Sequence, residues 1–341
     1  MARRTRTPRR KTAPSRWFIF AVIALVVVLY LVRRYQAPQP APSSGVAPSA
    51  EPGTVRIASW NIRTLSNRKG DPELRKIAAI MSRFDLVAVQ EPKDTQVLER
   101  LCALLPGWRY VASEAVGRGT STEHYAFFWN ASRVALVGKS CIVGDPDDLF
   151  IREPYAATFR ARRFDFTLCT MHLLYGSSER ERRLELLLMD EVVAAVQNAN
   201  GAEADVILLG DFNFPPDDEG WQLSGWTPAI RPPAKTTVGD RSLYDNIWFD
   251  PRVTTEYAGE SGVVRFDVED YGGDAERAKR ELSDHRPIWA AFSSLADDDP
   301  DDYGNLSRAE VRHRARTASA FALGELLVAV GWHVPCTIQP R

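Results

Sequence analysis

The chain has 341 residues, enough for one large domain or two ordinary ones, and its hydrophobic content of 45% is ample for a buried core. Its formal charge of −1 hides an asymmetry, because residues 54–296 hold 29 Lys and Arg against 36 Asp and Glu, a net charge of −7. A domain that binds nucleic acid through general electrostatics is usually basic. This composition therefore excludes that mode and favours a local site at which a metal ion supplies positive charge.

The N-terminal segment is predicted to be a membrane anchor. Residues 1–16 hold seven Arg or Lys and no acid, which is typical of a cytoplasmic N-terminus. The uncharged residues 17–32 follow, and Arg33 and Arg34 come directly after them. As a helix this run covers roughly 24 Å, short of a bilayer core of about 30 Å, but the flanking arginines can extend it. Residues 17–34 are therefore predicted to be a transmembrane signal anchor.

A cleaved signal peptide is the alternative for this segment. The long basic region and the two arginines directly after the apolar run favour the uncleaved anchor. The positive-inside rule then predicts a single-pass protein of the cell membrane, with everything after Arg34 outside the cytoplasm. Both alternatives export the remainder of the chain. Residues 35–53, rich in Pro, Ala and Ser, are predicted to be an extended, disordered linker.

From residue 54 the chain alternates short apolar runs with helical patterns. Nine runs are predicted to be strands: 55–61, 86–90, 125–129, 135–142, 156–160, 164–172, 206–210, 246–249 and 287–292. Three segments are predicted to be helices: 72–83, 95–105 and 179–198. Many strands with few helices at irregular spacing indicate two packed sheets with helices outside them.

The longest predicted helix has a recognisable start and an apolar face. Ser178 and Glu181 have the spacing of a capping box at its N-terminus. Its apolar face is predicted to belong to the protein core rather than to a partner groove, and consists of Leu184, Leu187, Leu188, Val192 and Val196.

Residues 297–341 are predicted to be an acidic linker and a C-terminal tail. The apolar run 318–332 is too short and too rich in Gly and Ala to predict a second span. An amphipathic tail that docks on the membrane or the domain, and a disordered tail, both stay open. Four cysteines without close spacing are predicted to be small core residues, although Cys141 and Cys169 could meet on neighbouring strands.

Polar side chains follow several of the predicted strands, and their types suit metal-assisted phosphodiester cleavage. That reaction needs an in-line nucleophile, a cation on the non-bridging oxygens and a proton source for the leaving oxygen. Glu91 directly follows a buried run and is a natural Mg²⁺ ligand, with Asn61, at the end of the first strand, orienting it. Oxygen ligands of this kind suit Mg²⁺, and also Ca²⁺ or Mn²⁺.

The stretch Gly210-Asp211-Phe212-Asn213 is the most specific of the short motifs. Gly210 permits close backbone approach, and Asp211 and Asn213 are expected to project to one side by the strand period. Asp and Asn at this spacing can hold a scissile phosphate or a second cation.

Two further segments offer groups for proton transfer. His172 ends one predicted strand, and the pair Asp284-His285 comes just before the last one. Asp245 can orient the His285 imidazole and favour its charged form, as a carboxylate does in catalytic triads.

Together and in this order, these segments resemble the endonuclease/exonuclease/phosphatase superfamily over roughly residues 54–296, and within it the deoxyribonuclease I-like enzymes. The stretches EHYAF at 123–127, IREP at 151–154 and LYDNI at 243–247 are similar to deoxyribonuclease blocks of the types E-x-Y-x-F, R-E-P and Y-D-x-I. The resemblance implies an α/β fold, a four-layer αββα sandwich, with the site at one edge of the two sheets.

The resemblance also implies roles for particular residues. Glu91 is the main metal ligand, with Asn61 nearby and Asp284 completing the cluster on the metal side. His285 with Asp245 forms one histidine–carboxylate pair, and His172 with Glu123 forms the other. Asp211 and Asn213 contact the phosphate or a second metal. Either histidine can be the base and the other the acid.

Contacts with the substrate backbone are less closely matched. Arg152 is expected to face a backbone phosphate, and Arg118 is the best candidate for a minor-groove contact. The small disulfide loop of secreted deoxyribonuclease I is not recognisable, and Pro215 and Pro216 occupy the region of the cysteine that follows its GDFN block. DNA is therefore less firmly indicated as the substrate than the chemistry.

The sequence thus predicts a membrane-anchored, extracytoplasmic, divalent-metal-dependent phosphodiesterase. A DNA endonuclease is the leading interpretation, with nucleic acid and the membrane as partners and no protein partner predicted. A phospholipid or sphingolipid phosphodiesterase of the same superfamily is the first alternative. A catalytically inactive binding module on this scaffold is the second.

Overall fold

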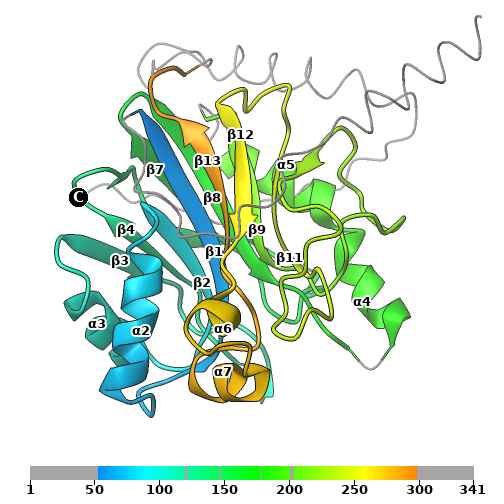
Figure 1. Ribbon diagram of the computed structural model, residues 1–341. Helices are drawn as coiled ribbons and strands as arrows, with labels where there is room; N and C mark the ends of the chain where they lie inside the picture. The colour runs from blue at the N-terminus through cyan, green and yellow to red at the C-terminus, as the bar shows by residue number, and fades with distance from the viewer. Residues whose placement is uncertain (1–52, 120–121, 146, 177, 200–202, 298–341) are drawn as a thin grey trace, which may run out of the picture. The chain divides into compact units, whose positions relative to one another are not determined.

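The computed structural model describes residues 53–119, 122–145, 147–176, 178–199 and 203–297 (Figure 1). The predicted anchor at 17–34, and nearly all of the linker at 35–53 and of the tail at 297–341, lie outside these residues. Across the described ranges, no helix has the length and apolar character needed to cross a membrane.

The first sheet has six strands, of which only β1 and β2 run parallel. Its order is β12 (Tyr257–Val263), β13 (Ile288–Ser293), β1 (Thr54–Leu65), β2 (Leu86–Pro92), β4 (Ala126–Asn130) and β3 (Trp108–Ala112).

The second sheet repeats this plan, with β8 and β9 as its parallel pair. Its order is β10 (Thr227–Pro228), β11 (Asp245–Phe249), β9 (Val206–Asp211), β8 (Phe164–His172), β7 (Tyr155–Ala161) and β5 (Ala135–Leu136), with β6 (Cys141–Ile142) also paired to β7. In each sheet the carboxyl ends of the parallel pair carry the polar residues singled out in the sequence.

The two sheets face each other across an apolar core, and helices cover their outer faces (Figure 1). Alternation along β1 shows why: Val55 and Ile57 belong to the core between the sheets, whereas Ala58 and Trp60 pack toward the helices. The first sheet is covered by α2 (Asp71–Met81), α3 (Thr95–Ala103), α6 (Phe266–Glu269) and α7 (Ala275–Glu281). The second is covered by α4 (Glu179–Leu186) and α5 (Met189–Ala199).

The predicted strands are all present, although 135–142 forms two short strands rather than one. Strands β3, β10 and β12 and the short helices α6 and α7 were not predicted from the sequence. Strand β12 lies at the edge of its sheet, and three consecutive residues of its Tyr-Ala-Gly-Glu-Ser-Gly-Val sequence are exposed. Its sequence therefore shows no alternation of apolar and polar residues.

The prediction of one long apolar helix at 179–198 was wrong. The chain leaves the helix at Leu187 and begins a second one at Met189, so the apolar positions do not form a single stripe. Leu184 and Leu187 are 57% and 47% exposed, whereas Val192 and Val196 are buried. The capping interaction at the N-terminus is present, since the Glu181 amide donates to Ser178 Oγ at 3.3 Å.

The idea that Cys141 and Cys169 meet on neighbouring strands was also wrong. Ala156 of β7 pairs with Cys141 on one side and with Cys169 on the other, so a whole strand separates the two cysteines. Cys102 and Cys169 are free thiols.

Candidate active site

The polar residues predicted from sequence meet where the parallel pairs of the two sheets end. In the second sheet His172 lies opposite Asp211, and Asp211 lies opposite Asp245, so three adjacent strands present polar groups at one level. In the first sheet Asn61 pairs with Gln90, immediately before Glu91. The pairing of the strands therefore sets the positions of these residues along the edge of each sheet.

His285 is held by a carboxylate from the opposite sheet. Its Nδ1 lies 2.9 Å from Asp245 Oδ2 and 3.1 Å from Oδ1, and its Nε2 lies 3.5 Å from Asp211 Oδ2. Burial alone would lower the pKa of His285, but the Asp245 and Asp211 carboxylates outweigh it and hold the pKa well above the usual range. The contact expected between Asp245 and the His285 imidazole is thus present, and the carboxylate favours the protonated ring by raising its pKa.

His172 is arranged in the same way with a different carboxylate. Its Nδ1 lies 3.0 Å from Glu123 Oε1, and its Nε2 lies 3.6 Å from Asp211 Oδ2. Burial lowers the pKa of His172, and the attraction of Glu123 more than compensates, so the net pKa is raised. Two imidazoles therefore approach one carboxylate with the same ring nitrogen.

Asp211 lies at the centre of the arrangement and is almost fully buried. Burial would raise its pKa, but the two histidines outweigh that effect, with help from the Asn213 amide and the Asn61 side chain, and the pKa is lowered. Asn61 Nδ2 donates to Asp211 Oδ2 at 3.0 Å and to Glu91 Oε1 at 3.1 Å. One amide thus bridges two carboxylates.

This bridged group fits a divalent cation. Asn61 Oδ1 is buried and has no hydrogen-bond partner among the described residues. With the amide turned over, so that Oδ1 faces the carboxylates of Glu91 and Asp211, the three residues would offer oxygen donors of the type that Mg²⁺ and Ca²⁺ prefer. A second group, made of Asp211, Asp245 and His285, has ligand atoms within 4.8 Å of one another. Asp211 is common to both groups.

The backbone at the site adopts conformations that are rare for residues other than glycine. Glu91 and Asn213 have φ values of +68° and +55°, in the left-handed region. At Gly210, φ is +148°, and an added Cβ would lie 1.9 Å from the Met171 carbonyl oxygen. The close approach expected of this glycine is therefore present, and any side chain there would force β8 and β9 apart.

Asn213 is not placed by the strand period. Strand β9 ends at Asp211, and the Asn213 amide then turns back to donate to Asp211 Oδ1 at 3.0 Å. Its side-chain Nδ2 donates to the Leu173 carbonyl at 2.8 Å. Asn213 is thus part of the site through a turn rather than through an extended strand.

Arg152 is positioned differently from the sequence expectation. Its side chain is 7% exposed, and it donates to the carbonyls of His172 at 2.8 Å and Leu173 at 3.1 Å. Its Nε also lies 4.0 Å from Glu123 Oε2. In this position Arg152 braces the end of β8 and the Glu123 carboxylate, and its contact with a backbone phosphate stays a prediction.

Arg118 and Asp284 lie at the margins of the site. Arg118 is 49% exposed and is paired with Asp148, while also donating to the Phe150 carbonyl at 3.2 Å. Asp284 forms an ion pair with Arg63, whose Nη1 lies 3.6 Å from Asp284 Oδ2. The structure therefore places Asp284 against an arginine, and its part in the metal-side cluster stays a prediction.

Several supporting residues were not found from the sequence. The His172 amide donates to Tyr125 Oη at 3.0 Å, and the Asp245 amide donates to Thr236 Oγ1 at 3.1 Å. The buried Glu185 carboxylate accepts from the amides of Ile151 and Leu174, at 2.8 and 2.6 Å. Tyr125 could have been identified, because it lies two positions after Glu123. The other two carry no local signal.

The comparison with known proteins agrees with this geometry. The sequence profile of the endonuclease/exonuclease/phosphatase family matches residues 58–285. A protein named deoxyribonuclease from Thioalkalivibrio sp. (strain K90mix) is 34% identical over 266 residues, covering 72% of this chain and 73% of that protein. Deoxyribonuclease-1 of Equus caballus is 27% identical, covering 69% of this chain and 91% of that one.

The fold is shared with solved structures as well. A crystal structure of an endonuclease/exonuclease/phosphatase family protein from Bacteroides thetaiotaomicron has a TM-score of 0.51 at 20% identity, covering 72% of this chain and 96% of that one. The paired sheets, the matched profile and the identity to the bacterial relative agree. The chain belongs to the endonuclease/exonuclease/phosphatase family and is a hydrolase of phosphoric ester bonds.

Proposed function

We propose that the protein is a divalent-metal-dependent, deoxyribonuclease I-like endonuclease that hydrolyses DNA. The observation that carries the proposal is the pairing of His172 and His285 with separate carboxylates while both Nε2 atoms lie within 3.6 Å of Asp211 Oδ2. The names of the bacterial relative and of the horse enzyme support DNA as the substrate class.

The histidine geometry defines a proton-transfer chemistry. Because a carboxylate accepts a hydrogen bond from each Nδ1, the proton stays on Nδ1 and Nε2 is left to take up or release a proton at the centre of the site. One histidine removes a proton from water as the water oxygen forms a bond to phosphorus. The other gives a proton to the leaving oxygen as its bond to phosphorus breaks, which yields a phosphate monoester and an alcohol. Either histidine can take either role.

The charge of the site explains why a cation is needed. The carboxylates of Glu91, Glu123, Asp211 and Asp245 surround a position that must accept an anionic phosphodiester. Glu91, Asn61 and Asp211 would hold Mg²⁺, with Ca²⁺ or Mn²⁺ as alternatives. The bound ion supplies positive charge to the non-bridging oxygens of the phosphate.

A substrate panel tests the proposal directly. The full chain is incubated with duplex DNA, single-stranded DNA, RNA and phospholipid vesicles, each with Mg²⁺ and with a chelator. We expect cleavage of DNA that the chelator abolishes and that His172→Ala removes. Headgroup release from vesicles without DNA cleavage would favour the lipid phosphodiesterase, and an inert protein on every substrate would favour the binding module.

The cellular setting is proposed from the sequence alone. The basic residues 1–16 and the uncharged run that follows support a signal anchor at 17–34, with residues 54–296 as the catalytic domain outside the cytoplasm. Recovery of the full chain in the membrane fraction, and digestion of the domain by protease added to intact cells or spheroplasts, are the expected results. A released, shortened chain would indicate the cleaved signal peptide instead.

A further inference from the structure

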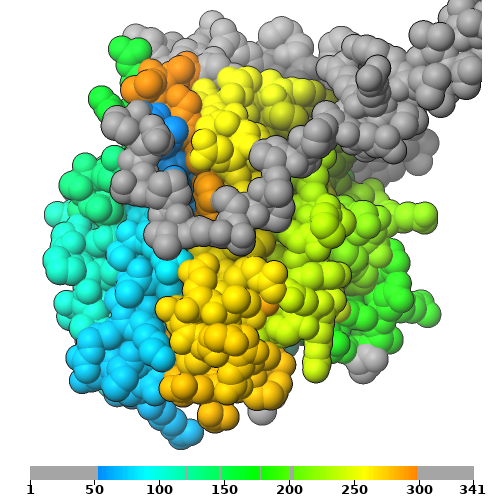
Figure 2. Space-filling model, viewed as in Figure 1, coloured from blue at the N-terminus to red at the C-terminus, as the bar shows by residue number. Residues whose placement is uncertain are grey.

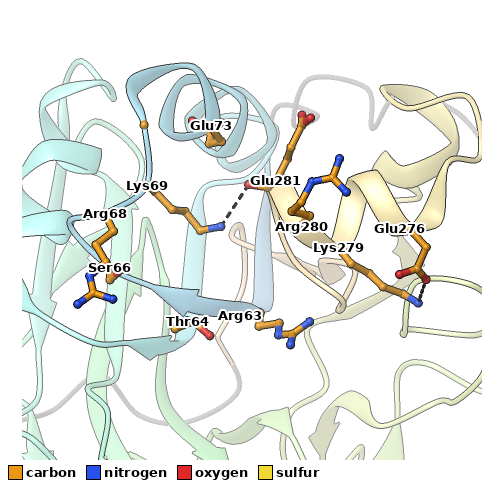
Figure 3. A pocket seen from close by; sticks show the side chains of 11 residues that line it. Arg63, Thr64, Ser66, Arg68, Lys69, Glu73, Glu276, Lys279, Arg280 and Glu281 are labelled. Carbon is orange, nitrogen blue, oxygen red and sulfur yellow. Dashed lines mark hydrogen bonds and ion pairs between the residues drawn. The ribbon is translucent and has the colours of Figure 1, made fainter.

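A second polar cavity lies directly beside the candidate active site. It has a volume of about 620 Å³ and is formed by the segment that follows Asn61 on β1 together with α7 (Figure 3). These segments are far apart in the chain but lie side by side on one face of the molecule (Figures 1 and 2). Its cationic lining residues are Arg63, Arg68, Lys69, Lys279 and Arg280.

The positive charge of this basic pocket is only partly neutralised. Arg68 and Arg280 are exposed and, within the described ranges, have no hydrogen-bond or ion-pair partner. Lys69 Nζ donates to the carbonyls of Glu281 at 3.2 Å and Leu282 at 2.8 Å, which leaves its charge to be offset only in part by the nearby Glu73. An anion entering the pocket would therefore meet cations that are already positioned.

Two of the acids at the pocket are engaged with other cations. Glu276 accepts from Lys279 at 2.9 Å, and this pair is drawn in Figure 3. Glu281 accepts from Arg277 at 2.7 Å and from Lys76 at 3.3 Å, both of which lie outside the pocket lining. These contacts leave Arg68, Lys69 and Arg280 as the main groups available to a ligand.

The segments that line the pocket also contact residues of the candidate active site. The Thr64 amide donates to Glu91 Oε2 at 2.9 Å, and Arg63 pairs with Asp284 at 3.6 Å. On the other wall, α7 ends at Glu281 and leads through Ser283 to Asp284 and His285. A strand whose scissile phosphate lies at the histidines would thus carry its neighbouring phosphates toward the pocket.

The lining also indicates which part of a nucleic acid it would take. The pocket contains no aromatic side chain among its eleven described lining residues, so it offers no surface on which a base can stack. Cations without stacking partners recognise the sugar–phosphate backbone and carry little sequence information. The chemistry is that of a phosphate subsite.

We propose that this basic pocket binds a phosphate of the substrate strand other than the one that is cut. The proposal rests on the proposed nuclease function and assigns Arg68, Lys69 and Arg280 to substrate binding. The ligand is an internal backbone phosphate or a terminal phosphate monoester, which share the same chemistry.

The test measures binding rather than cleavage. In a His172→Ala background with Mg²⁺, which removes the proposed cleavage step, the full chain is titrated with a fluorescent duplex hairpin, and anisotropy is recorded at several salt concentrations. The pocket variant is Arg68→Gln/Arg280→Gln. The matched control is Arg162→Gln/Arg163→Gln, which removes two exposed arginines at the opposite end of β8 from His172.

We expect the pocket variant to bind on the order of tenfold more weakly at physiological salt, and the slope of log K against log salt to be smaller by about 2. The control pair should leave both quantities near those of the background protein. Equal binding by the pocket and control variants, or no hairpin binding by the background protein, overturns the proposal.

Two further measurements distinguish a terminal from an internal phosphate, and the pocket proposal from the nuclease proposal. The affinity lost through Arg68→Gln/Arg280→Gln is compared for a hairpin with a 5′-phosphate and one with a 5′-hydroxyl. A larger loss for the 5′-phosphate hairpin indicates that the pocket binds a terminal monoester. Equal losses indicate an internal phosphate. Cleavage by the protein with His172 intact is measured separately. A protein that binds the hairpin through the pocket yet cuts no DNA contradicts the nuclease function and leaves the phosphate subsite supported.

Discussion

The two histidine–carboxylate pairs are alike in geometry and unlike in their surroundings. In both, Nδ1 faces a carboxylate that comes from the opposite sheet. His172 ends β8 of the second sheet and meets Glu123, which precedes β4 of the first. His285 precedes β13 of the first sheet and meets Asp245, which begins β11 of the second. Each pair therefore ties the two sheets together at the site.

The surroundings differ in their balance of charge. The Glu123 carboxylate lies 3.7 Å from Lys93 Nζ and 4.0 Å from Arg152 Nε; the attraction of His172 and these cations overcomes burial and lowers its pKa. Asp245 has no lysine or arginine as an ion-pair partner in the part of the chain that the structure describes, and burial and Asp211 raise its pKa. Lysine and arginine thus compensate the carboxylate beside His172, whereas only the imidazole itself pairs with the carboxylate beside His285 in the described residues.

The largest expected effect is the loss of either imidazole. Because His172 and His285 are proposed to carry the two proton transfers, we expect His172→Ala and His285→Ala each to lower kcat on duplex DNA by about 10²–10⁴-fold. The measurement is initial-rate cleavage with saturating Mg²⁺, and unchanged urea unfolding would show that the fold is intact.

The leaving group can assign the two roles. A phosphodiester with a nitrophenolate leaving group does not need protonation, so it should restore the rate of the variant that lacks the acid and not of the variant that lacks the base. Equal recovery of both variants would mean that the two histidines do not divide these roles.

The next effect concerns metal affinity. Because Glu91 and Asp211 are the carboxylates proposed to hold the cation, Glu91→Gln and Asp211→Asn should weaken Mg²⁺ binding by at least about tenfold, measured by calorimetry in the absence of substrate. Glu123→Gln is the matched control, because it removes a carboxylate that already has cationic neighbours. A loss of affinity as large for Glu123→Gln would contradict the comparison.

A smaller effect is expected in the stability of the metal-free protein. Folding lowers the pKa of Glu123, so the stability that Glu123 contributes is present above its unfolded pKa. Folding raises the pKa of His172, so the stability that His172 contributes is lost as the pH rises through the folded pKa. Glu123→Gln should therefore destabilise most at about pH 5–6.5. Asp245→Asn removes the carboxylate that holds the pKa of His285 well above its usual range, so its destabilisation should persist to higher pH than that of Glu123→Gln.

Denaturant unfolding with chelator at pH 5.5, 7 and 8.5 measures both variants on one scale. Glu114→Gln, on an exposed residue, serves as the control for removal of a carboxylate. The comparison between the pairs is contradicted if the destabilisation by Asp245→Asn fades at a lower pH than that by Glu123→Gln.

The sequence allowed the strand ends to be predicted because apolar runs stop where the chain leaves the core. Asn61, Glu91, His172 and Asp211 each follow such a run, and the structure brings all four together. The pairing of Glu123 with His172 joins residues 49 apart and came from resemblance to a family, since no local pattern specifies it.

The parts that could not be predicted depend on tertiary contacts. Glu185 looks like an ordinary surface acid on an amphipathic helix, yet it is 2% exposed and holds two loop amides. The basic pocket joins Arg68 and Lys69 to Lys279 and Arg280 across more than two hundred residues. Each pair alone is what a solvated surface normally carries, so only the packing of α7 against the segment after β1 shows that they line one cavity.

The smallest effect is expected at Ser283, which holds the loop of His285 to the first strand. Its Oγ donates to the Asn61 carbonyl at 2.7 Å and accepts from the amides of Arg63 and His285, both at 3.1 Å. Ser283→Ala removes these bonds without adding bulk, so we expect a loss of about 1–2 kcal/mol in the free energy of unfolding. Because Ser283 reaches both a metal-side residue and a histidine, kcat on DNA should fall together with stability.

Ser82→Ala, at an exposed hydroxyl bonded to the Ala79 carbonyl, is the control. An unchanged kcat in Ser283→Ala would show that the His285 loop keeps its position without this link, and that the Asp245 contact alone orients the imidazole.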